Sequence, residues 1–452
     1  MTQHSLSQYQ TDHLFLLVGT NPLPNYVAAM LLAKGDGKIY LLHTPTKKGT
    51  GVVASRLKTA IVRDLPGMIA ERVILREISE SNRNDIVSKV NTLLNQMNRS
   101  VGLNYTGGMK PMALHVYRAI EQRLGTDAIF SYLDARSLEM LIEEHRGVPA
   151  QSQLVPRNLQ LSLEHLMALH GYVRAWDEED VKRRKAVLNR EGKPQDAPQQ
   201  TPVLEDLCRA LATVHSTEEG FREWRKFIKP RPLRRLPLTS DDELLKPVAE
   251  VLEQLRVDGR AAEAELIRIL EMGKAGLESC RHFLQGDWLE EYVLSTLAET
   301  VRALDIKHYG INLKPLRPGE KDAPSETNEH APSEEEEEQT EKKEKEQKKD
   351  KRQIDLAAMY GYQLFTISCQ VTKNKDSAQE HLFEVFTRAR QLGGDEARVG
   401  VITCLDPSTA ALLQREIEQD WDADGKIKVF AKDHLPRLSA HLTDWFKQVN
   451  KG

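Results

Sequence analysis

A regular alternation of short apolar strands and amphipathic helices in the first 150 residues restricts the fold more than any other feature. Residues 14–18 (LFLLV) form a continuous apolar run that ends at Gly19, and residues 39–43 (IYLLH) form a second such run. Short runs without polar alternation are typical of strands buried on both faces of a parallel sheet. With helices between them, they predict a Rossmann-like, doubly wound α/β domain over residues 1–150.

The same rhythm assigns the further elements of this domain. We expect helices over about residues 26–33, 55–63, 83–98 and 111–124, and further strands over residues 72–78 and 100–104. Gly35 and Gly37 flank an aspartate in the segment GDG, which is expected to end the first helix.

The pattern changes twice after residue 150. Residues 151–275 are expected to form a helical connector, and residues 276–452 a second α/β domain with a hairpin about residues 360–362. Residues 317–352 of that domain contain the runs EEEEE and EKKEKEQKKDKR and almost no apolar side chains. Such a segment cannot bury enough surface to offset its ordering entropy, so we expect a disordered charged insert or a frayed charged helix there.

The charge balance limits how the chain can meet nucleic acid. Of the 452 residues, 63 are Lys or Arg and 67 are Asp or Glu, which gives a formal net charge of −4. A nucleic-acid surface must therefore be local. The densest basic stretches outside the insert are residues 182–190 and 222–235. In the second stretch, Trp224 and Phe227 either stack on bases or are buried beneath a solvated basic face.

The cysteines and the absence of long apolar runs indicate a cytoplasmic protein without membrane contact. Cys208, Cys280, Cys369 and Cys404 form no CxxC pair and no cluster with zinc-ligand spacing. Scattered reduced thiols are typical of the cytosol. The polar start MTQHSLSQYQTDH lacks the apolar core of a signal peptide, and no run reaches the ~18 residues of a membrane span.

Two turns at strand ends gather small and polar residues. Each leads from the carboxyl end of a predicted strand into a helix N-terminus, whose free N–H groups and dipole favour phosphate. This edge of an open parallel sheet is where ligands bind. The candidate ligand-binding residues are Gly19, Thr20, Asn21, Asn104, Thr106, Gly107, Gly108, Met109 and Lys110. Taken alone, either turn can be a simple helix cap. Neither matches GxGxxG or GxxxxGK[ST], which argues against a dinucleotide site or a Walker ATPase.

The strand–NPLPN–helix start and the later segment NYTGGMKPMAL resemble CRISPR-associated Rossmann-fold (CARF) sensor domains over about residues 10–150. The second turn of that family reads N-x-T-G-G-x-K-x-M, and this chain matches it at Asn104, Thr106, Gly107, Gly108, Lys110 and Met112. The resemblance implies a homodimer that binds a cyclic oligoadenylate, with cyclic tetra-adenylate as the first choice, in the groove between its sensor domains. A ring with rotational symmetry suits a two-fold interface.

Three segments of the C-terminal domain resemble the PD-(D/E)XK nuclease domain that follows the sensor in CRISPR ancillary nucleases. Residues 286–293 (GDWLEEYV) are similar to the helix G-x-W-[LF]-E-E-Y-V and contain Glu290. Asp355 stands where the family has its first metal-binding aspartate, and residues 364–370 (LFTISCQ) resemble a strand that ends in I-E-C-K. The resemblance implies that Glu290 and Asp355 hold Mg²⁺ or Mn²⁺, which polarises the phosphate and activates water.

The chain departs from this pattern at two predicted catalytic positions. Ser368 replaces the second acid and Gln370 replaces the lysine. The site can work in altered form on Glu290, Asp355 and Ser368, with Gln370 positioning water. Alternatively, the missing groups come from elsewhere, or the domain binds nucleic acid without cleaving it. The candidates for supplying the missing groups are Glu380, Glu384 and Lys373.

These features together predict a type III CRISPR ancillary effector. Cyclic oligoadenylate would bind a sensor dimer and activate metal-dependent cleavage of DNA or RNA. The alternative is a ligand-gated nucleic-acid-binding or regulatory protein whose nuclease domain is catalytically degenerate, and a third interpretation is a nucleotide-binding enzyme with an unrelated C-terminal domain. The sequence leaves open the ring size, the choice of DNA or RNA, and whether the sensor degrades its activator.

Overall fold

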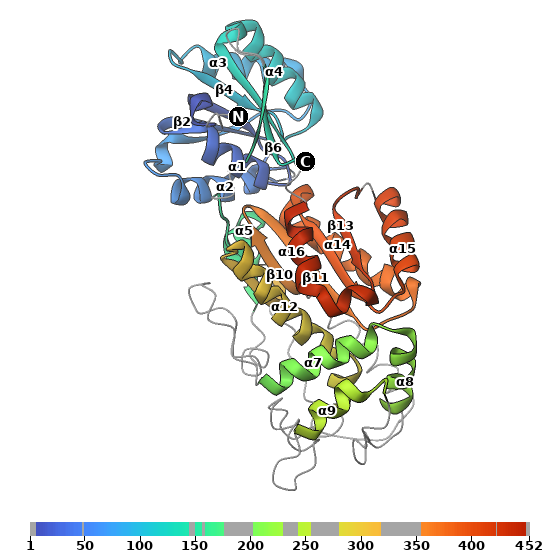
Figure 1. Cartoon of the computed structure of the whole chain (residues 1–452). Helices are drawn as coiled ribbons and strands as arrows, with labels where there is room; N and C mark the ends of the chain where they lie inside the picture. Colours follow the sequence, from blue (N-terminus) through green and yellow to red (C-terminus); the bar gives the residue numbers. More distant parts are fainter. Residues whose placement is uncertain are drawn as a thin grey trace, which may run out of the picture.

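The chain folds into two α/β domains, one above the other in Figure 1. The computed structural model describes residues 6–47, 49–143, 150–155, 159–175, 202–228, 243–254, 280–317, 354–421 and 423–448. The charged insert from residue 318 onward and the basic stretch at residues 182–190 lie outside these ranges.

A seven-stranded sheet of order β3-β2-β1-β4-β5-β6-β7 forms the centre of the N-terminal domain. Its parallel strands are β1 (Thr11–Leu17), β2 (Ala33–His43), β3 (Val73–Glu77), β4 (Val101–Asn104) and β5 (Ala128–Asp134). The strands β6 (Glu139–Ile142) and β7 (Gln151–Leu154) are added antiparallel at one edge. The predicted parallel α/β sheet is confirmed, whereas the antiparallel edge was not anticipated from the sequence.

Two pairs of helices cover this sheet. Side chains of β1 point alternately to the two sides. Leu14 and Leu16 enter the core beneath α1 (Leu23–Leu32) and α2 (Gly51–Asp64). Phe15 and Leu17 enter the core beneath α3 (Arg83–Leu94) and α4 (Lys110–Leu124). Burial on both sides is the reason that residues 14–17 of this strand are all apolar.

The boundary between α1 and β2 differs from the prediction. The helix begins at Leu23 rather than Tyr26, because Pro24 is tolerated in the first turn of a helix. The GDG segment does not end the helix but lies inside β2. A Cβ on Gly37 would lie 2.7 Å from the carbonyl oxygen of Asp12, so the glycine marks a close approach of two backbones.

The C-terminal domain contains a six-stranded mixed sheet of order β13-β12-β11-β10-β9-β8. The strands are β8 (Val173–Ala175), β9 (His308–Leu316), β10 (Ile354–Tyr360), β11 (Gln363–Gln370), β12 (Arg398–Thr403) and β13 (Ile427–Phe430). The predicted hairpin joins β10 to β11 through Gly361, whose φ of +64° favours glycine.

Helices also cover both faces of the second sheet. Apolar side chains of α14 (Lys375–Gly393) and α15 (Pro407–Asp420) share a core with Leu364 on one face. Those of α12 (Trp288–Leu304) and α16 (Leu438–Gln448) share a core with Phe365 on the other. Consecutive residues of β11 therefore face different helices.

The range predicted to form a helical connector, residues 151–275, is divided over the molecule where the structure describes it. Its first strand, β7, completes the N-terminal sheet, and β8 forms an edge of the C-terminal sheet. The helices α7 (Pro202–His215), α8 (Glu218–Ile228) and α9 (Lys246–Gln254) lie at the end of the C-terminal domain remote from the N-terminal domain (Figure 1). They are held there because α7 and α9 share a hydrophobic core with α12.

Among the described elements, the short helix α5 (Leu163–His170) packs between the two domains. It packs against α2 on one side and against α14 on the other. Its residues Leu166 and Met167 belong to one continuous core that includes Leu16 of β1 and Leu382 of α14. Apolar packing thus runs without a break from one domain to the other.

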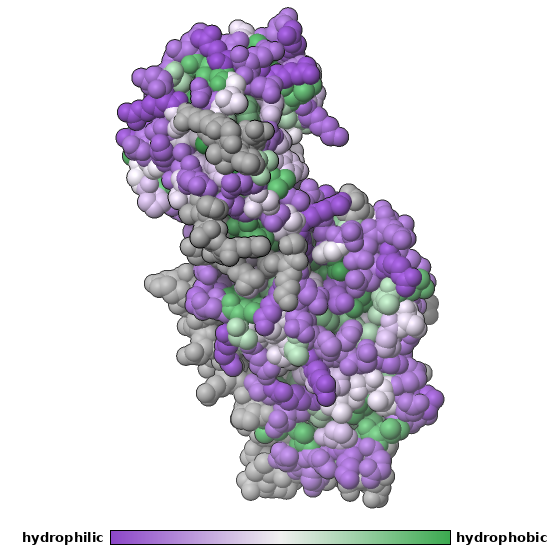
Figure 2. Space-filling view, turned by 45° about the horizontal axis from the view of Figure 1, so that its top comes forward, coloured by the Kyte–Doolittle hydropathy of each residue, from purple (hydrophilic) through white to green (hydrophobic). Residues whose placement is uncertain are grey.

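Hydrophilic residues cover most of the face drawn in Figure 2, and hydrophobic residues gather there in small groups. No described helix combines the length and the apolar character that crossing a bilayer requires.

The packing of α5 can be tested with two Leu→Ala variants. Leu166 is 1% exposed, so Leu166→Ala should lower the free energy of unfolding by about 2–5 kcal/mol through lost burial and a cavity. Leu412→Ala on α15 removes a side chain that is 44% exposed and should change stability by less than about 0.5 kcal/mol. Urea unfolding followed by circular dichroism measures both, and equal small effects would contradict the packing described here.

Candidate functional site

The two predicted ligand turns meet at the topological switch point of the N-terminal sheet. Strands β1 and β4 are neighbours, and the chain continues from β1 to β2 on one side and from β4 to β5 on the other. The carboxyl ends of strands border a crevice at such a point. Here the turns touch, because a Cβ on Gly19 would lie 3.0 Å from the backbone nitrogen of Gly108.

Glycine is required in the second turn by this contact. A Cβ on Gly107 would lie 2.2 Å from the carbonyl oxygen of Leu17. Gly108 has φ of +78°, and a Cβ there would lie 2.9 Å from the Leu17 side chain. The TGG sequence is therefore needed to lay one backbone turn directly on the end of β1.

Several of the predicted ligand residues surround these turns with accessible groups. Thr20 and Lys110 are exposed, and Met109 is 47% exposed. Thr106 is half-buried, and its Oγ1 accepts a hydrogen bond of 2.7 Å from the backbone nitrogen of Leu133. No side chain caps the N-terminus of α4, so N–H groups of its first turn remain available to an anion.

The two asparagines hold the turns in place instead of standing open to a ligand. Asn104 is fully buried, and its Nδ2 donates to Ser131 Oγ at 3.1 Å. Asn21 Oδ1 accepts from the backbone nitrogen of Leu23 at 3.0 Å. Asn21 Nδ2 donates to Glu396 Oε2 at 3.2 Å, which ties the first turn to the C-terminal domain.

Glu396 lies at the buried junction of the domains, two residues before β12. Its side chain is 1% exposed, and burial raises the pKa of its carboxyl to about 7. Two residues later, Arg398 Nη2 donates to the carbonyl oxygen of Ala135 in the N-terminal domain at 3.0 Å. The candidate ligand turn is thus connected to β12, and β12 pairs in parallel with β11.

A compact polar cluster lies where β10 and β11 carry the predicted catalytic positions. Asp355 Oδ2 accepts hydrogen bonds from Ser368 Oγ at 2.7 Å and from the backbone nitrogen of Cys369 at 2.9 Å. Ser368 Oγ also lies 2.6 Å from His381 Nε2 on α14. A hydroxyl has one proton, so donation to Asp355 leaves Oγ to accept from Nε2–H of the imidazole.

The other two predicted catalytic residues are Gln370, at the end of β11, and Glu290, on α12. Gln370 Nε2 donates to Ser377 Oγ at 2.9 Å, and its buried Oε1 has no hydrogen-bond partner among the described residues. Glu290 is half-buried in the first turn of α12, which packs on the sheet face opposite α14.

The residues considered as substitutes for the missing acid and lysine do not join the cluster in the contacts described. Glu380 is exposed and Glu384 is half-buried on α14. Lys373 forms an ion pair with Glu218 of α8 at 2.5 Å.

The donors present do not fit the metal site that the resemblance implied. Mg²⁺ and Mn²⁺ prefer several oxygen ligands, with carboxylates among them. The hydrogen-bonded cluster offers one carboxylate, one hydroxyl and one imidazole. Over the described ranges, no three His, Cys, Asp or Glu side chains form a group that could hold a metal ion. We therefore derive no catalytic step through a metal.

His381 is the residue at this site that the sequence analysis missed. A signal existed, because Ala378, Leu382 and Val385 mark the buried side of α14 at helical spacing. Residue 381 lies next to this stripe, so the helix following β11 carries it toward the sheet. The sequence alone gave no reason to prefer it to its acidic neighbours.

The aromatic residues of the basic stretch are placed by α8. Trp224 is 1% exposed, and its Nε1 donates to the carbonyl oxygen of Leu284 at 3.1 Å. Phe227 is half-buried. The alternative of buried aromatics beneath a basic face therefore holds for Trp224, and base stacking on its ring does not.

Titration of Glu396 gives a prediction for stability. Its raised pKa means that the folded state keeps a proton that the unfolded chain releases, so its contribution to stability falls as pH rises from about 4.5 to about 7. Glu396→Gln mimics the protonated form. Its free energy of unfolding relative to the natural chain should therefore rise by roughly 1–3 kcal/mol between about pH 5 and pH 8.

Urea unfolding of both chains at the two pH values measures this difference, in which the other titrating groups cancel. A pH-independent difference would show that Glu396 titrates normally.

Two solved structures have a fold similar to that of this chain. Can2 from Sulfobacillus thermosulfidooxidans, solved in complex with cyclic tetra-adenylate, is 15% identical with a TM-score of 0.61, and the match covers 98% of both chains. Protein VC1899 from Vibrio cholerae is 16% identical with a TM-score of 0.59, and the match covers 98% of this chain and 100% of that one.

Sequence comparison adds no closer relative. No protein-family model matches the chain, and no curated protein matches it significantly. At these identities the likeness concerns the fold. The chain thus has the mixed α/β architecture of Can2 and VC1899 over nearly its whole length.

Proposed function

We propose that this chain is a cyclic-oligoadenylate-responsive CRISPR ancillary effector, with an N-terminal CARF sensor and a C-terminal domain that acts on nucleic acid. The observation that carries the proposal is the glycine turn of Gly107 and Gly108, packed on the end of β1 at the switch point of the sheet. Can2, which shares the fold, was solved with cyclic tetra-adenylate, and this supports that ring as the ligand.

Binding of the cyclic oligoadenylate would use the switch-point edge of the N-terminal sheet from each of two subunits. Exposed Lys110 and the uncapped N-terminus of α4 provide positive potential for phosphate. Met109 and Leu114 of the same region are 47% and 48% exposed, and apolar groups of this kind favour burial against a second subunit. A homodimer would present two equal turns to one symmetric ring.

The signal would pass through the direct junction of the domains. Asn21 of the first turn contacts Glu396, and β12 follows at once. A ring that binds one arrangement of this junction more tightly than another shifts the population of the whole molecule. The helices α7 to α9 lie away from the junction and are not needed for this route (Figure 1).

For the action on nucleic acid, the two candidates are cleavage and binding alone. Cleavage is supported by Asp355 and His381, a carboxylate and an imidazole that meet at Ser368, since imidazole can transfer a proton during phosphodiester hydrolysis. Binding alone is favoured by the missing second carboxylate and by Gln370 in the lysine position. The resemblance implied Mg²⁺ or Mn²⁺ as the cofactor of cleavage, so the assay below includes both ions as a direct test of a metal requirement.

The sensor proposal predicts the effect of Lys110→Ala. Loss of this cation should weaken cyclic tetra-adenylate binding about tenfold without changing the fold, because the side chain is exposed. Lys447→Ala, which removes an exposed cation from α16, is the matched control and should leave binding unchanged. Isothermal titration calorimetry measures both, and equal affinities of the two variants would remove Lys110 from the site.

The two candidates are separated by a cleavage assay. The protein is incubated with single- and double-stranded DNA and RNA, with Mg²⁺ or Mn²⁺, and with or without cyclic tetra- or hexa-adenylate. Cleavage should require the ring and should fall at least about 100-fold in Asp355→Ala and in His381→Ala. Ring-dependent binding without any cleavage would establish the binding candidate, and no affinity for either ring would refute the sensor.

A further inference from the structure

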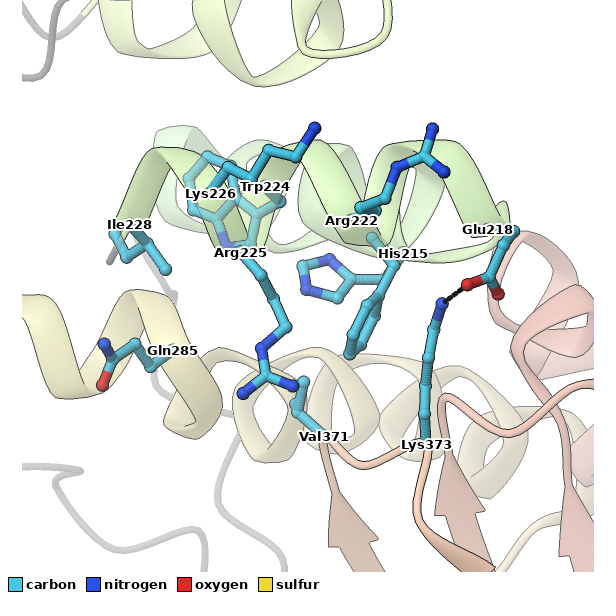
Figure 3. Close-up of a pocket in the computed structure, with 11 residues that line it drawn as sticks. His215, Glu218, Arg222, Trp224, Arg225, Lys226, Ile228, Gln285, Val371 and Lys373 are labelled. Carbon is cyan, nitrogen blue, oxygen red and sulfur yellow. Dashed lines mark ion pairs between the residues drawn. The ribbon is translucent and has the colours of Figure 1, made fainter. Parts of the chain in front are cut away.

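A cavity of about 620 Å³ lies between α8, residues 283–287 and the segment that follows β11. We call it the α8 pocket. Its lining includes Phe221, Arg222, Arg225, Lys226, Gln285 and Lys373. In Figure 3 the Arg225 side chain extends from α8 toward Val371 and Gln285, and Lys373 extends from the opposite wall toward Glu218.

Positive charge exceeds negative charge around this pocket. Arg222, Arg225, Lys226 and Lys373 line it, and Lys432 lies beside it. Against these five cations stand the carboxylates of Glu218 and Glu223. They form ion pairs of 2.5–3.5 Å with Lys373, Lys432, Lys226 and Arg222. The pocket therefore has a surplus of cations.

Arg225 is the one of these five cations that the ion pairs do not include. It forms no ion pair with any described residue, and its guanidinium carbon lies 5.8 Å from the centre of the Phe221 ring. Lys373 Nζ lies 4.2 Å from the same ring centre. Phe221 is 3% exposed and anchored in the core, so both cations are supported by a fixed aromatic surface. An anion that enters the pocket would meet Arg225 without displacing an ion pair with a described carboxylate.

The pocket adjoins the end of β11 that carries the polar cluster. Val371 and Lys373 line the pocket, and they follow Ser368 and Gln370 directly in the chain. Cys369 and Val371 pack on the α12 side of the sheet, whereas Ser368 bonds to α14 on the other side. A polymer that crosses the end of β11 would thus meet both the cluster and the pocket.

We infer that the α8 pocket binds a phosphate of one nucleotide in a single-stranded nucleic acid, adjacent to the phosphodiester that the C-terminal domain acts on. The inference rests on the proposed function. A nucleotide fits a concavity of this volume, while a duplex presents its phosphates on a stiff, convex surface. Arginine binds phosphate with two parallel hydrogen bonds, and the guanidinium of Arg225 forms no ion pair with a described residue that would compete with them.

The test measures binding of fluorescein-labelled single strands of about 12 nucleotides to the full chain, with cyclic tetra-adenylate present. Arg225→Gln should weaken binding about tenfold and reduce the slope of log affinity against log salt by about 0.7, the value for one phosphate contact. Arg415→Gln removes an exposed cation from α15 and is the matched control, with a change below about twofold.

A second variant changes affinity in the opposite direction. Glu218→Gln releases Lys373 and Lys432 from their ion pairs, so binding of the single strand should become tighter.

If the natural chain binds the strand but Arg225→Gln behaves like Arg415→Gln, the pocket is not the site and the proposed function stands. If the natural chain binds no strand with the ring present, the proposed function fails and the inference with it. Equal weakening of duplex binding would overturn the single-stranded occupant.

Discussion

Continuous apolar packing through α5 is the interaction on which the arrangement of both domains depends. Leu166 and Met167 lie in a core that extends from β1 of the first sheet to α14 and β10 of the second. Because interiors are close-packed, a shift at one end of such a core is felt at the other. The junction can therefore hold Asn21 against Glu396, two groups that are 375 residues apart in the chain.

This junction changes how a ligand signal would travel. The turn that contains Asn21 touches the glycine turn of Gly107 and Gly108, and Asn21 bonds to Glu396, two residues before β12. Strand β12 pairs with β11, whose Ser368 lies in the polar cluster. The carboxyl of Glu396 lies on this path, and burial raises its pKa. Such a group makes the junction sensitive to small changes in its surroundings.

The C-terminal centre differs in chemistry from the nuclease pattern that its sequence resembles. Ser368 and Gln370 remove one negative and one positive charge from the strand, and the structure adds His381 next to Ser368. The resulting cluster is less acidic than a site that holds a hard divalent cation. Positive charge gathers instead around α8, where Arg225 forms no ion pair with a described residue.

What the sequence determined by itself was local. Strand and helix periodicity predicted the parallel sheet and most elements of the second domain. The TGG turn predicted a ligand site at one edge of the first sheet. These features depend on neighbours along the chain. The tertiary structure decided which distant groups meet. It placed His381 against Ser368, Asn21 against Glu396, and α7 to α9 away from the domain junction. Such contacts depend on how buried faces pack, and no periodicity within a single segment encodes them.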